Sequence, residues 1–177
     1  MSSADIVVIG GGINGTSAAM HLAKRGVGKV VLIEQGHLAS GATGRSTAMI
    51  RDLYSYPSLV NIAIESSSFF RNYQTNTGVD IGFNTTGRVL LFGEKDRISA
   101  ETIVKMNKEM GVDVSIISVE ETAKILPEAY LNDVSFGIWE PKSGYADPVL
   151  ATYAFAEEAR SYGAEIITHK RVTGYKI

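Results

Sequence analysis

The sequence predicts an α/β fold in which a Rossmann-like domain is interrupted by a partial domain of mixed β and α structure. Two observations predict this fold. The chain opens with a strand, a glycine-rich turn, a helix and a second strand, which is the order of a βαβ unit. Short β-rich segments then follow, before a helix and a strand return near the end. We expect one domain to comprise residues 1–80 and 144–177, and part of a second domain to comprise residues 81–143.

The βαβ unit begins with the apolar run Ile6–Ile9, whose β-branched residues are typical of a buried parallel strand. Small and then apolar residues follow at helical spacing in 16–23, and Gly26 separates this helix from a second apolar strand, 30–33. The second strand ends on Glu34, where an acid accepts hydrogen bonds from the ribose hydroxyls of a dinucleotide. An acid at this position also repels a 2′-phosphate, so we expect NADP to be disfavoured.

Three glycines, Gly10, Gly12 and Gly15, stand between the strand and the helix in the G-x-G-x-x-G spacing. The first permits a tight turn, the second lets a pyrophosphate approach the backbone, and the third lets the helix lie close to the sheet. The amides that start the helix, those of Ile13 and Asn14 among them, favour phosphate oxygens. A glycine-rich turn that binds no ligand is the alternative. The complete order of strand, glycines, helix, strand and acid indicates a dinucleotide site.

A loop rich in small and hydroxyl residues, 36–51, follows the acid. The backbone of such a loop can approach a ligand closely, and its hydroxyl groups and amides can bind a pyrophosphate or the edge of a ring. Without its context the segment would be a flexible linker, but ligands of α/β folds gather beyond the carboxyl ends of strands. The predicted ligand-binding residues here are Gln35, Ser40, Gly41, Ala42, Thr43, Arg45, Ser46 and Thr47.

Composition narrows the functional classes. The 17 basic and 19 acidic residues give a net charge of −2, which offers no electrostatic argument for nucleic acid or an anionic membrane. No apolar run is long enough for a membrane span, and no secretory signal is visible, so we expect a cytoplasmic protein. The absence of cysteine excludes disulfides and thiolate chemistry. The three histidines lack the spacing of metal ligands, so we expect no metal site.

Four further helices are predicted, over 57–76, 96–110, 118–126 and 148–162. A capping box opens the third, and Asp147 is the expected N-cap of the fourth. The predicted buried face of the first consists of Leu59, Ile62, Ala63, Ser66, Phe69, Phe70 and Tyr73.

Four further β segments are expected beside these helices. Residues 83–92 are rich in β-forming residues around a glycine, which predicts a hairpin or strand pair. Residues 112–117 alternate as a half-buried strand, and 134–140 and 164–167 are also strand-like.

The first fifty residues resemble the flavoprotein family of D-amino-acid oxidase, glycine oxidase and sarcosine oxidase. They look most similar to sarcosine oxidase β-subunit-like and dimethylglycine dehydrogenase-like members. The resemblance is carried by Ile9–Gly15, Leu32–Glu34 and Ala39–Ser46. In that family the third stretch wraps the flavin, which implies FAD rather than NAD. Some relatives carry a histidine here that bonds covalently to the flavin, whereas this chain has Arg45 or Ser46, so we expect non-covalent FAD.

The resemblance also implies roles outside the first fifty residues. Arg51 resembles an arginine near the flavin that helps to hold the substrate carboxylate, and a guanidinium suits a carboxylate because it can bind both oxygens. A solvated arginine at the start of a helix is the alternative. Val172 matches a residue that holds the adenine through its backbone. Family members continue much further, so we expect this chain to be an N-terminal part that contains the Rossmann-like FAD-binding domain and part of the substrate domain.

The implied function is FAD-dependent oxidation of a small amino acid or N-methylated amine, such as sarcosine, glycine or dimethylglycine. A hydride passes to the flavin, and water hydrolyses the resulting imine. Two alternatives stay open. An NAD-dependent dehydrogenase shares the glycine pattern, although the 40–46 loop and the β-rich segment argue against it. A nucleotide-binding subunit or fragment, inactive alone, would dock to a partner through a broad exposed apolar face.

Overall fold

The computed structural model describes residues 3–175, and the chain divides into two compact units. Unit 1 consists of Met1–Ala48, Thr77–Gly82 and Ala146–Ile177, and unit 2 consists of Met49–Asn76 and Phe83–Tyr145. The division differs from the predicted boundaries because residues 49–76 group with unit 2. The physical reason is that the side chains of Leu53 and Val60 are buried in the core of unit 2. The functional identity of each unit stays a prediction.

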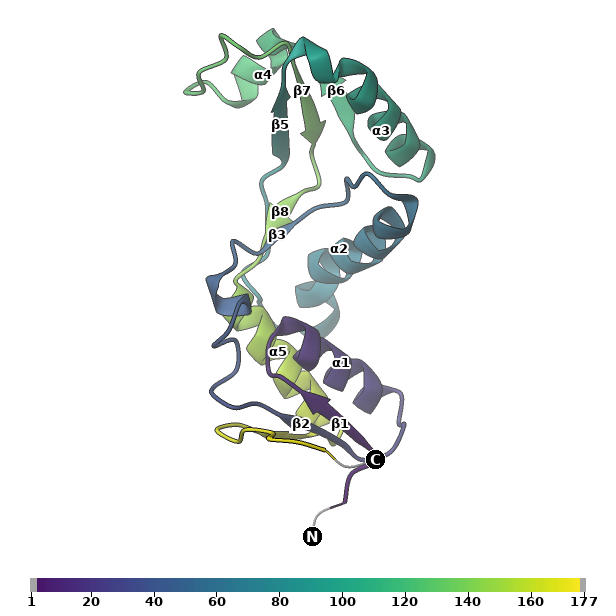
Figure 1. Ribbon diagram of the computed structural model, residues 1–177, viewed down its shortest axis with the longest axis vertical. Helices are drawn as coiled ribbons and strands as arrows, with labels where there is room; N and C mark the ends of the chain where they lie inside the picture. Colours follow the sequence, from purple (N-terminus) through teal and green to yellow (C-terminus); the bar gives the residue numbers. More distant parts are fainter. Residues whose placement is uncertain (1–2, 176–177) are drawn as a thin grey trace. The chain divides into compact units, whose positions relative to one another are not determined.

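Unit 1 contains the predicted βαβ unit (Figure 1). Strands β1 (Ile6–Ile9), β2 (Val30–Ile33) and β9 (Glu165–Ile167) form a fully parallel sheet in the order β1-β2-β9. Helix α1 (Ile13–Lys24) connects β1 to β2, and α5 (Pro148–Ser161) precedes β9. The carboxyl ends of all three strands therefore meet at one edge of the sheet, which is the edge where α1 begins.

The two helices of unit 1 pack against each other. Alanines form much of their buried surface, and Ala19 of α1 and Ala156 of α5 are fully inaccessible to solvent. Small side chains let helix backbones approach closely, which fixes both helices against the sheet. Helix α5 begins as predicted, because the Asp147 carboxylate accepts hydrogen bonds from the amides of Val149 and Leu150 at 2.8 and 2.9 Å.

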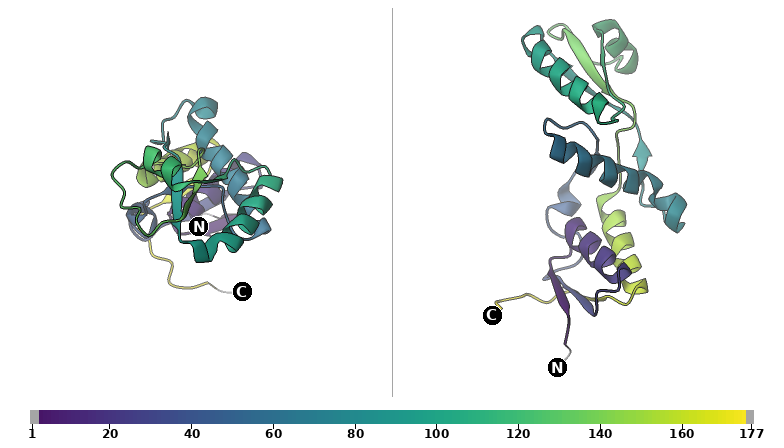
Figure 2. Two further views of the ribbon diagram at one scale, coloured as in Figure 1. Left: turned by 90° about the horizontal axis from the view of Figure 1, so that it is seen from above. Right: turned by 90° about the vertical axis from the view of Figure 1, so that its right-hand side faces the viewer.

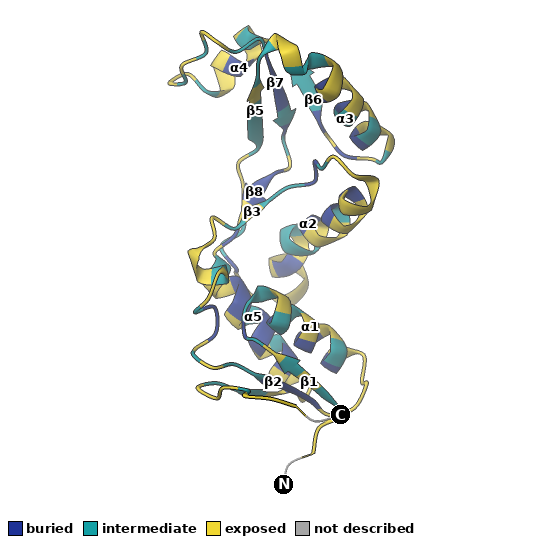
Figure 3. Ribbon diagram, in the orientation of Figure 1, coloured by how far each residue is buried: buried dark blue, intermediate teal, exposed yellow. Residues whose placement is uncertain are grey.

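Half-buried and exposed residues alternate along β1 (Figure 3). Val7 and Ile9 are 50% and 63% accessible to solvent, whereas Ile6 and Val8 are half-buried. Because successive side chains of a strand point to opposite faces, Val7 and Ile9 lie on the same side of the sheet. Unit 1 thus leaves apolar side chains of its first strand uncovered.

The larger sheet of unit 2 is antiparallel and contains β5 (Arg88–Phe92), β7 (Phe136–Glu140) and β6 (Ser115–Ile117), in that order. Helix α3 (Arg97–Glu109) lies beside this sheet (Figure 2). A short helix, α4 (Val119–Ile125), starts with the predicted capping box. The core of the unit consists of Leu53, Val60, Ala100, Val104, Val112, Val114, Phe136 and Ile138.

The predicted hairpin over 83–92 is wrong. The segment contains two strands, β4 (Asn84–Thr85) and β5, but they belong to different sheets. Strand β4 pairs with β8 (Gly144–Tyr145), which also pairs with β3 (Met49–Ile50). The chain changes direction at Gly87, whose φ of +72° favours glycine. Strands of two residues carry no periodic signal, so the sequence gives no indication of this small sheet.

Helix α2 (Pro57–Thr77) forms where expected, but its predicted buried face is partly wrong. The buried side chains of α2 are Val60, Ala63, Ser67 and Tyr73, whereas Leu59 and Ile62 of the predicted face are exposed. Burial of Ser67 explains why the buried face of α2 differs from the predicted one, since the Ser67 hydroxyl donates a hydrogen bond to the buried carboxylate of Asp52. A polar pair therefore selects the inward face of the helix, and an apolar pattern does not reveal such a pair.

Candidate functional site

The turn between β1 and α1 requires glycine at two of the three predicted positions. Gly10 has a φ of +108°, in the region that favours glycine, and its amide donates to the carbonyl of Ile33 at 2.9 Å. A Cβ atom at Gly15 would lie 1.9 Å from the carbonyl oxygen of Gly10. The helix can therefore approach the turn only because residue 15 has no side chain, as its place in the glycine pattern predicts.

The first turn of α1 presents amides without acceptors. The amide of Ile13 donates to the Thr43 hydroxyl at 3.1 Å. Within the described part of the chain, the amides of Gly12, Asn14 and Gly15 have no hydrogen-bond acceptor. This first turn also contains no acidic residue. Unpaired amides at the positive end of a helix dipole form a binding site for an anion such as a pyrophosphate.

Glu34 lies directly against this turn. Its Oε2 atom accepts a hydrogen bond from the amide of Gly11 at 2.6 Å, and its Oε1 atom accepts one from the amide of Gly36 at 2.8 Å. Hydrogen bonds from these amides, that of Gly36 first, hold the pKa of the Glu34 carboxyl below its usual value because they stabilise the charged form. Each carboxylate oxygen can accept a further bond, so the predicted contact with ribose hydroxyls stays compatible with this geometry.

The small-residue loop after β2 is folded back onto α1. It contains a short 3₁₀ helix, η1 (Thr43–Arg45), and the Thr43 hydroxyl reaches the first turn of α1. A Cβ atom at Gly44 would lie 2.4 Å from the carbonyl oxygen of Ala39. The Ser46 hydroxyl accepts a hydrogen bond from the amide of Ala48 at 2.9 Å. These contacts give the loop a defined conformation, which a flexible linker would lack.

Other predicted loop residues face open space. A Cβ atom at Gly41 would meet no heavy atom of the chain within 4 Å. Four further predicted ligand residues, Gln35, Ala42, Arg45 and Thr47, are exposed, while Ser40 is half-buried. The region around Gly41 can therefore accommodate a group that the chain itself does not supply.

The segment after β9 is joined to the end of β2. The amide of His169 donates to the carbonyl of Gly36, and that of Lys170 donates to the carbonyl of Glu34, both at 2.9 Å. These bonds hold residues 169–170 beside the end of β2, and the predicted adenine contact, Val172, follows two positions later in the sequence. Residues far apart in sequence thus gather in unit 1 around the start of α1.

Arg51 belongs to unit 2, whereas the residues around the start of α1 belong to unit 1. Its guanidinium lies over the ring of Tyr54, with the Cζ atom 4.5 Å from the ring centroid. Among the described residues, no carboxylate forms an ion pair with Arg51. The solvated arginine considered as an alternative does not describe this side chain, which is half-buried and stacked.

A polar cluster around Glu140 in unit 2 was not predicted from the sequence. Arg88 donates two hydrogen bonds to the Glu140 carboxylate, and the amides of Asp52 and Leu53 donate to its other oxygen. One feature of the sequence could have predicted this cluster. Glu140 ends the apolar strand-like run 134–140, and a charged side chain that is buried at the end of such a strand needs polar partners.

Residues 3–175 lack two other structural features. No helix there has the length and hydropathy required to cross a membrane. No group of three or more histidine, cysteine or acidic side chains there has an arrangement suited to a metal ion.

The family described as FAD dependent oxidoreductase matches residues 5–177. The chain belongs to this FAD-dependent oxidoreductase family.

Individual members of the FAD-dependent oxidoreductase family are similar to nearly the whole chain. Mouse mitochondrial dimethylglycine dehydrogenase is 31% identical over 175 residues, which cover 98% of this chain and 20% of that protein. The mouse mitochondrial pyruvate dehydrogenase phosphatase regulatory subunit is 32% identical over 167 residues, which cover 93% of this chain and 19% of that protein. The crystal structure of L-proline dehydrogenase from P. horikoshii matches with a TM-score of 0.93 and 33% identity, over 99% of this chain and 46% of that one.

These relatives confirm the α/β flavoprotein fold and the resemblance drawn from the glycine turn, the acid and the loop. The chain spans about a fifth of the length of the two mouse proteins to which it is similar. The activity, substrate and partners of a whole protein are therefore matters for proposal.

Proposed function

We propose that the chain is the FAD-binding part of an oxidoreductase that oxidises a small amino acid or N-methylated amine. The observation that carries the proposal is the arrangement at the start of α1, where the unpaired amides of Asn14 and Gly15 follow a turn whose Gly11 amide donates to the carboxylate of Glu34. This arrangement offers donors for a pyrophosphate and an acceptor for ribose hydroxyls within one βαβ unit.

The residues present suit FAD held without a covalent bond. The amides of Gly12, Asn14 and Gly15 would bind the pyrophosphate, and Glu34 would bind the ribose. The backbone at Val172 would hold the adenine. The remaining contacts would come from the loop of Ser40, Gly41, Ala42, Thr43, Arg45, Ser46 and Thr47 with its neighbour Gln35. The open space beside Gly41 supports this role because a ligand there would replace solvent rather than displace a side chain.

When bound, FAD supplies the acceptor for the hydride that leaves the carbon beside the amine nitrogen, and water hydrolyses the resulting imine. Arg51 would hold the carboxylate of an amino-acid substrate, for which a guanidinium without an acidic partner is suited. Sarcosine, glycine and dimethylglycine are the proposed substrates of the complete protein. The predicted cytoplasmic location belongs to the same proposal, and fractionation of cells that produce the protein would test it.

The first test is the absorbance spectrum of the purified chain, before and after precipitation with acid. We expect flavin bands near about 370 and 450 nm, and we expect the colour to remain in the supernatant because the FAD is not covalently bound. A colourless protein that takes up neither FAD nor NAD would contradict the proposed site. Uptake of NAD in preference to FAD would support the nicotinamide alternative.

A matched pair of variants locates the cofactor. Gly41→Ala adds a methyl group where the chain has no atom within 4 Å, so the fold should tolerate it. If FAD occupies the space beside residue 41, this variant should bind FAD more weakly with unchanged thermal stability of the apoprotein. Gly93→Ala in unit 2 is the control, because its Cβ atom would also meet only ordinary contacts. Equal FAD affinity of both variants would argue against a cofactor at Gly41.

A second candidate function is a nucleotide-binding subunit or fragment that acts only with a partner. The exposed apolar side chains of Val7 and Ile9 favour it, since an exposed apolar strand face is typical of a surface that binds another protein. The similarity of the chain to a protein named as a regulatory subunit also supports this candidate. Turnover of sarcosine or dimethylglycine by the isolated FAD-loaded chain would exclude this alternative.

A further inference from the structure

Met49 is the one exposed methionine in the part of the chain that the structure describes. It is the first residue of β3 and is 55% accessible to solvent. Met20 is fully buried, and Met106 and Met110 are half-buried. Because a dissolved oxidant must reach the sulfur atom, Met49 is the methionine that solvent chemistry modifies first.

The sulfur atom of Met49 lies against a guanidinium that has a poorly satisfied donor. The Nη1 atom of Arg88 is 3.9 Å from the Met49 Sδ atom, and a thioether sulfur is only a weak acceptor. The Nε and Nη2 atoms of Arg88 are engaged elsewhere, since they lie 3.0 and 2.7 Å from one oxygen of Glu140. Only 11% of the Arg88 side chain is accessible to solvent, so water can satisfy Nη1 only in part. Among the described residues, Nη1 has no stronger acceptor than this sulfur.

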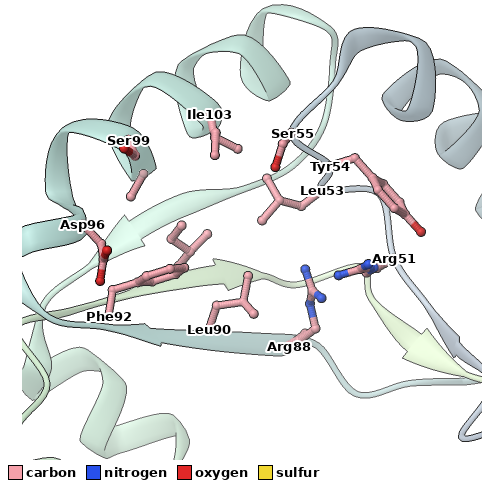
Figure 4. A pocket seen from close by; sticks show the side chains of 12 residues that line it. Arg51, Leu53, Tyr54, Ser55, Arg88, Leu90, Phe92, Asp96, Ser99 and Ile103 are labelled. Carbon is pink, nitrogen blue, oxygen red and sulfur yellow. The ribbon is translucent and has the colours of Figure 1, made fainter.

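A second positive charge lies beside this donor. The guanidinium groups of Arg51 and Arg88 line the same cavity of unit 2 and lie next to each other (Figure 4). Within residues 3–175, Glu140 forms an ion pair with Arg88, whereas no carboxylate forms one with Arg51. Two cations thus share one anion here, and an additional acceptor oxygen would form a charge-assisted hydrogen bond.

We propose that Met49 is a methionine-oxidation site, at which a peroxide converts the thioether to a sulfoxide that binds Arg88. With hydrogen peroxide the O–O bond breaks, one oxygen atom bonds to sulfur, and the other leaves as water. The sulfur loses a pair of electrons and the peroxide gains it. The new oxygen is a much stronger acceptor than the sulfur, so it binds the Nη1 donor. The site goes beyond the proposed function, because the modification requires neither FAD nor an amine.

The modification fastens the segment that starts at Met49 at both ends to one ion pair. The amides of Asp52 and Leu53, at the far end of the segment, already donate to the Glu140 carboxylate. The sulfoxide adds a bond at the near end through Arg88, the partner of Glu140. Strand β3 otherwise pairs with β8 over two residues only. Oxidation of Met49 therefore stabilises unit 2, whereas oxidation of a methionine in a core disrupts packing.

The test is limited oxidation of the purified chain by hydrogen peroxide, followed by peptide mass spectrometry and thermal unfolding. We expect the sulfoxide of Met49 to form at least about tenfold faster than that of Met20. The unfolding temperature should rise by about 2–4 °C as Met49 is oxidised. Met49→Leu, treated in the same way, is the control because it reports the effect of the other methionines. Oxidation of Met106 or Met110 before Met49, or no rise relative to this control, would overturn the proposal.

A pair of substitutions tests the acceptor oxygen without an oxidant. Glutamine has the shape of methionine sulfoxide, with an amide oxygen in place of the sulfoxide oxygen. Met49→Gln should therefore unfold about 2–4 °C above Met49→Leu. Leu91→Gln is the matched control, since Leu91 is an exposed apolar residue of another strand of unit 2, and it should give no rise. Equal unfolding temperatures of the two Met49 variants, or an equal rise in Leu91→Gln, would overturn the proposal.

A variant of Arg88 tests the partner of the sulfoxide. Arg88→Lys keeps a cation for Glu140 but removes the Nη1 donor, so oxidation of Met49 should no longer raise the unfolding temperature. A rise as large as that of the unmodified chain would overturn the assignment of Arg88. If this variant does not fold, the ¹⁵N signals of the Arg88 guanidinium in the unmodified chain decide. These signals should shift when Met49 is oxidised, and unchanged signals would contradict the proposed bond.

Discussion

The Glu140 carboxylate accepts a hydrogen bond from the backbone amide of Leu53 at 2.7 Å, across 87 positions of sequence. The same oxygen accepts the amide of Asp52 at 2.8 Å, and the other oxygen accepts two bonds from Arg88. Because Asp52 directly follows Arg51, this buried acid fixes the backbone that carries the proposed carboxylate-binding arginine. Glu140 thus positions Arg51, although only Arg51 is proposed to bind a ligand.

Removal of the Glu140 charge should destabilise unit 2 strongly. In Glu140→Gln the amide nitrogen of the new side chain competes with the donors of Arg88, whose charge stays buried without an acid. The cost of breaking a buried pair in this way is about 3–5 kcal/mol, which urea denaturation of the chain would measure. Glu157→Gln breaks a more exposed pair with Arg160 and should change the free energy of unfolding by less than about 1 kcal/mol. Similar values for the two variants would contradict the central role of Glu140.

Glu34 should make the stability of unit 1 depend on pH. The amides of Gly36 and Gly11 lower its pKa in the folded chain, so the folded state favours the carboxylate. The resulting stabilisation is fully present above the pKa of the unfolded chain, about 4.3, and is lost as the pH falls through the lower folded value. Glu34→Gln should therefore be less stable than the unmodified chain at pH 7, and the difference should shrink in acid. Thermal unfolding between about pH 3 and pH 7 would measure this difference. A difference that is constant over this range would refute the assignment.

Gly15→Ala should disrupt the start of α1. The added Cβ atom would lie 1.9 Å from the carbonyl oxygen of Gly10, and backbone atoms on both sides leave little room for relaxation. We expect a loss of at least about 1–3 kcal/mol of stability, as in other cases of overpacking, together with loss of FAD binding. Gly93→Ala is the control, because it replaces a glycine by alanine at a position where the added Cβ atom meets no close contact. If Gly15→Ala had unchanged stability and FAD affinity, the close approach of helix and turn would be incorrect.

The Thr43 hydroxyl should contribute to the stability of α1 through the amide of Ile13. Thr43→Val keeps the shape of the side chain but leaves that amide without its acceptor, at a cost of about 1 kcal/mol. Thr43→Ser keeps the hydroxyl and should be close to the unmodified chain. Hydrogen exchange at the Ile13 amide offers a local measurement, since exchange should accelerate in the valine variant alone. Equal exchange rates in both variants would argue against this contact.

Local signals in the sequence predict most of the helices and the parallel unit. The caps at Ser118 and Asp147 are set by residues within one turn, and the glycines of the first turn are specified by steric contacts of their own segment. Predictions fail where distant residues decide. Burial of Ser67 depends on Asp52, and β4 pairs with a strand that is about 60 positions further along the chain. Such partners cannot be read from the periodicity of one segment.

The site residues also differ in whether nearby or distant parts of the sequence determine their surroundings. The glycines, Glu34 and the loop that bears Thr43 all lie within the first fifty residues, so the motif predicts a cluster, and in unit 1 Glu34 and Thr43 do contact the turn before α1. Arg51 is the exception, because its surroundings in unit 2 depend on Glu140 and Arg88 from two other strands. Its role near a flavin stays a prediction.

The order β1-β2-β9 also has a consequence for biosynthesis. Strand β2 lies in the middle of the sheet, yet one of its neighbours is encoded near the other end of the chain. At roughly 5–20 residues per second, the ribosome takes several seconds to deliver that neighbour after β2 has emerged. Throughout that interval the nascent chain exposes the unpaired edge of Val31, Leu32 and Ile33. Chaperones that bind short apolar segments would have their best opportunity there, before the sheet can close.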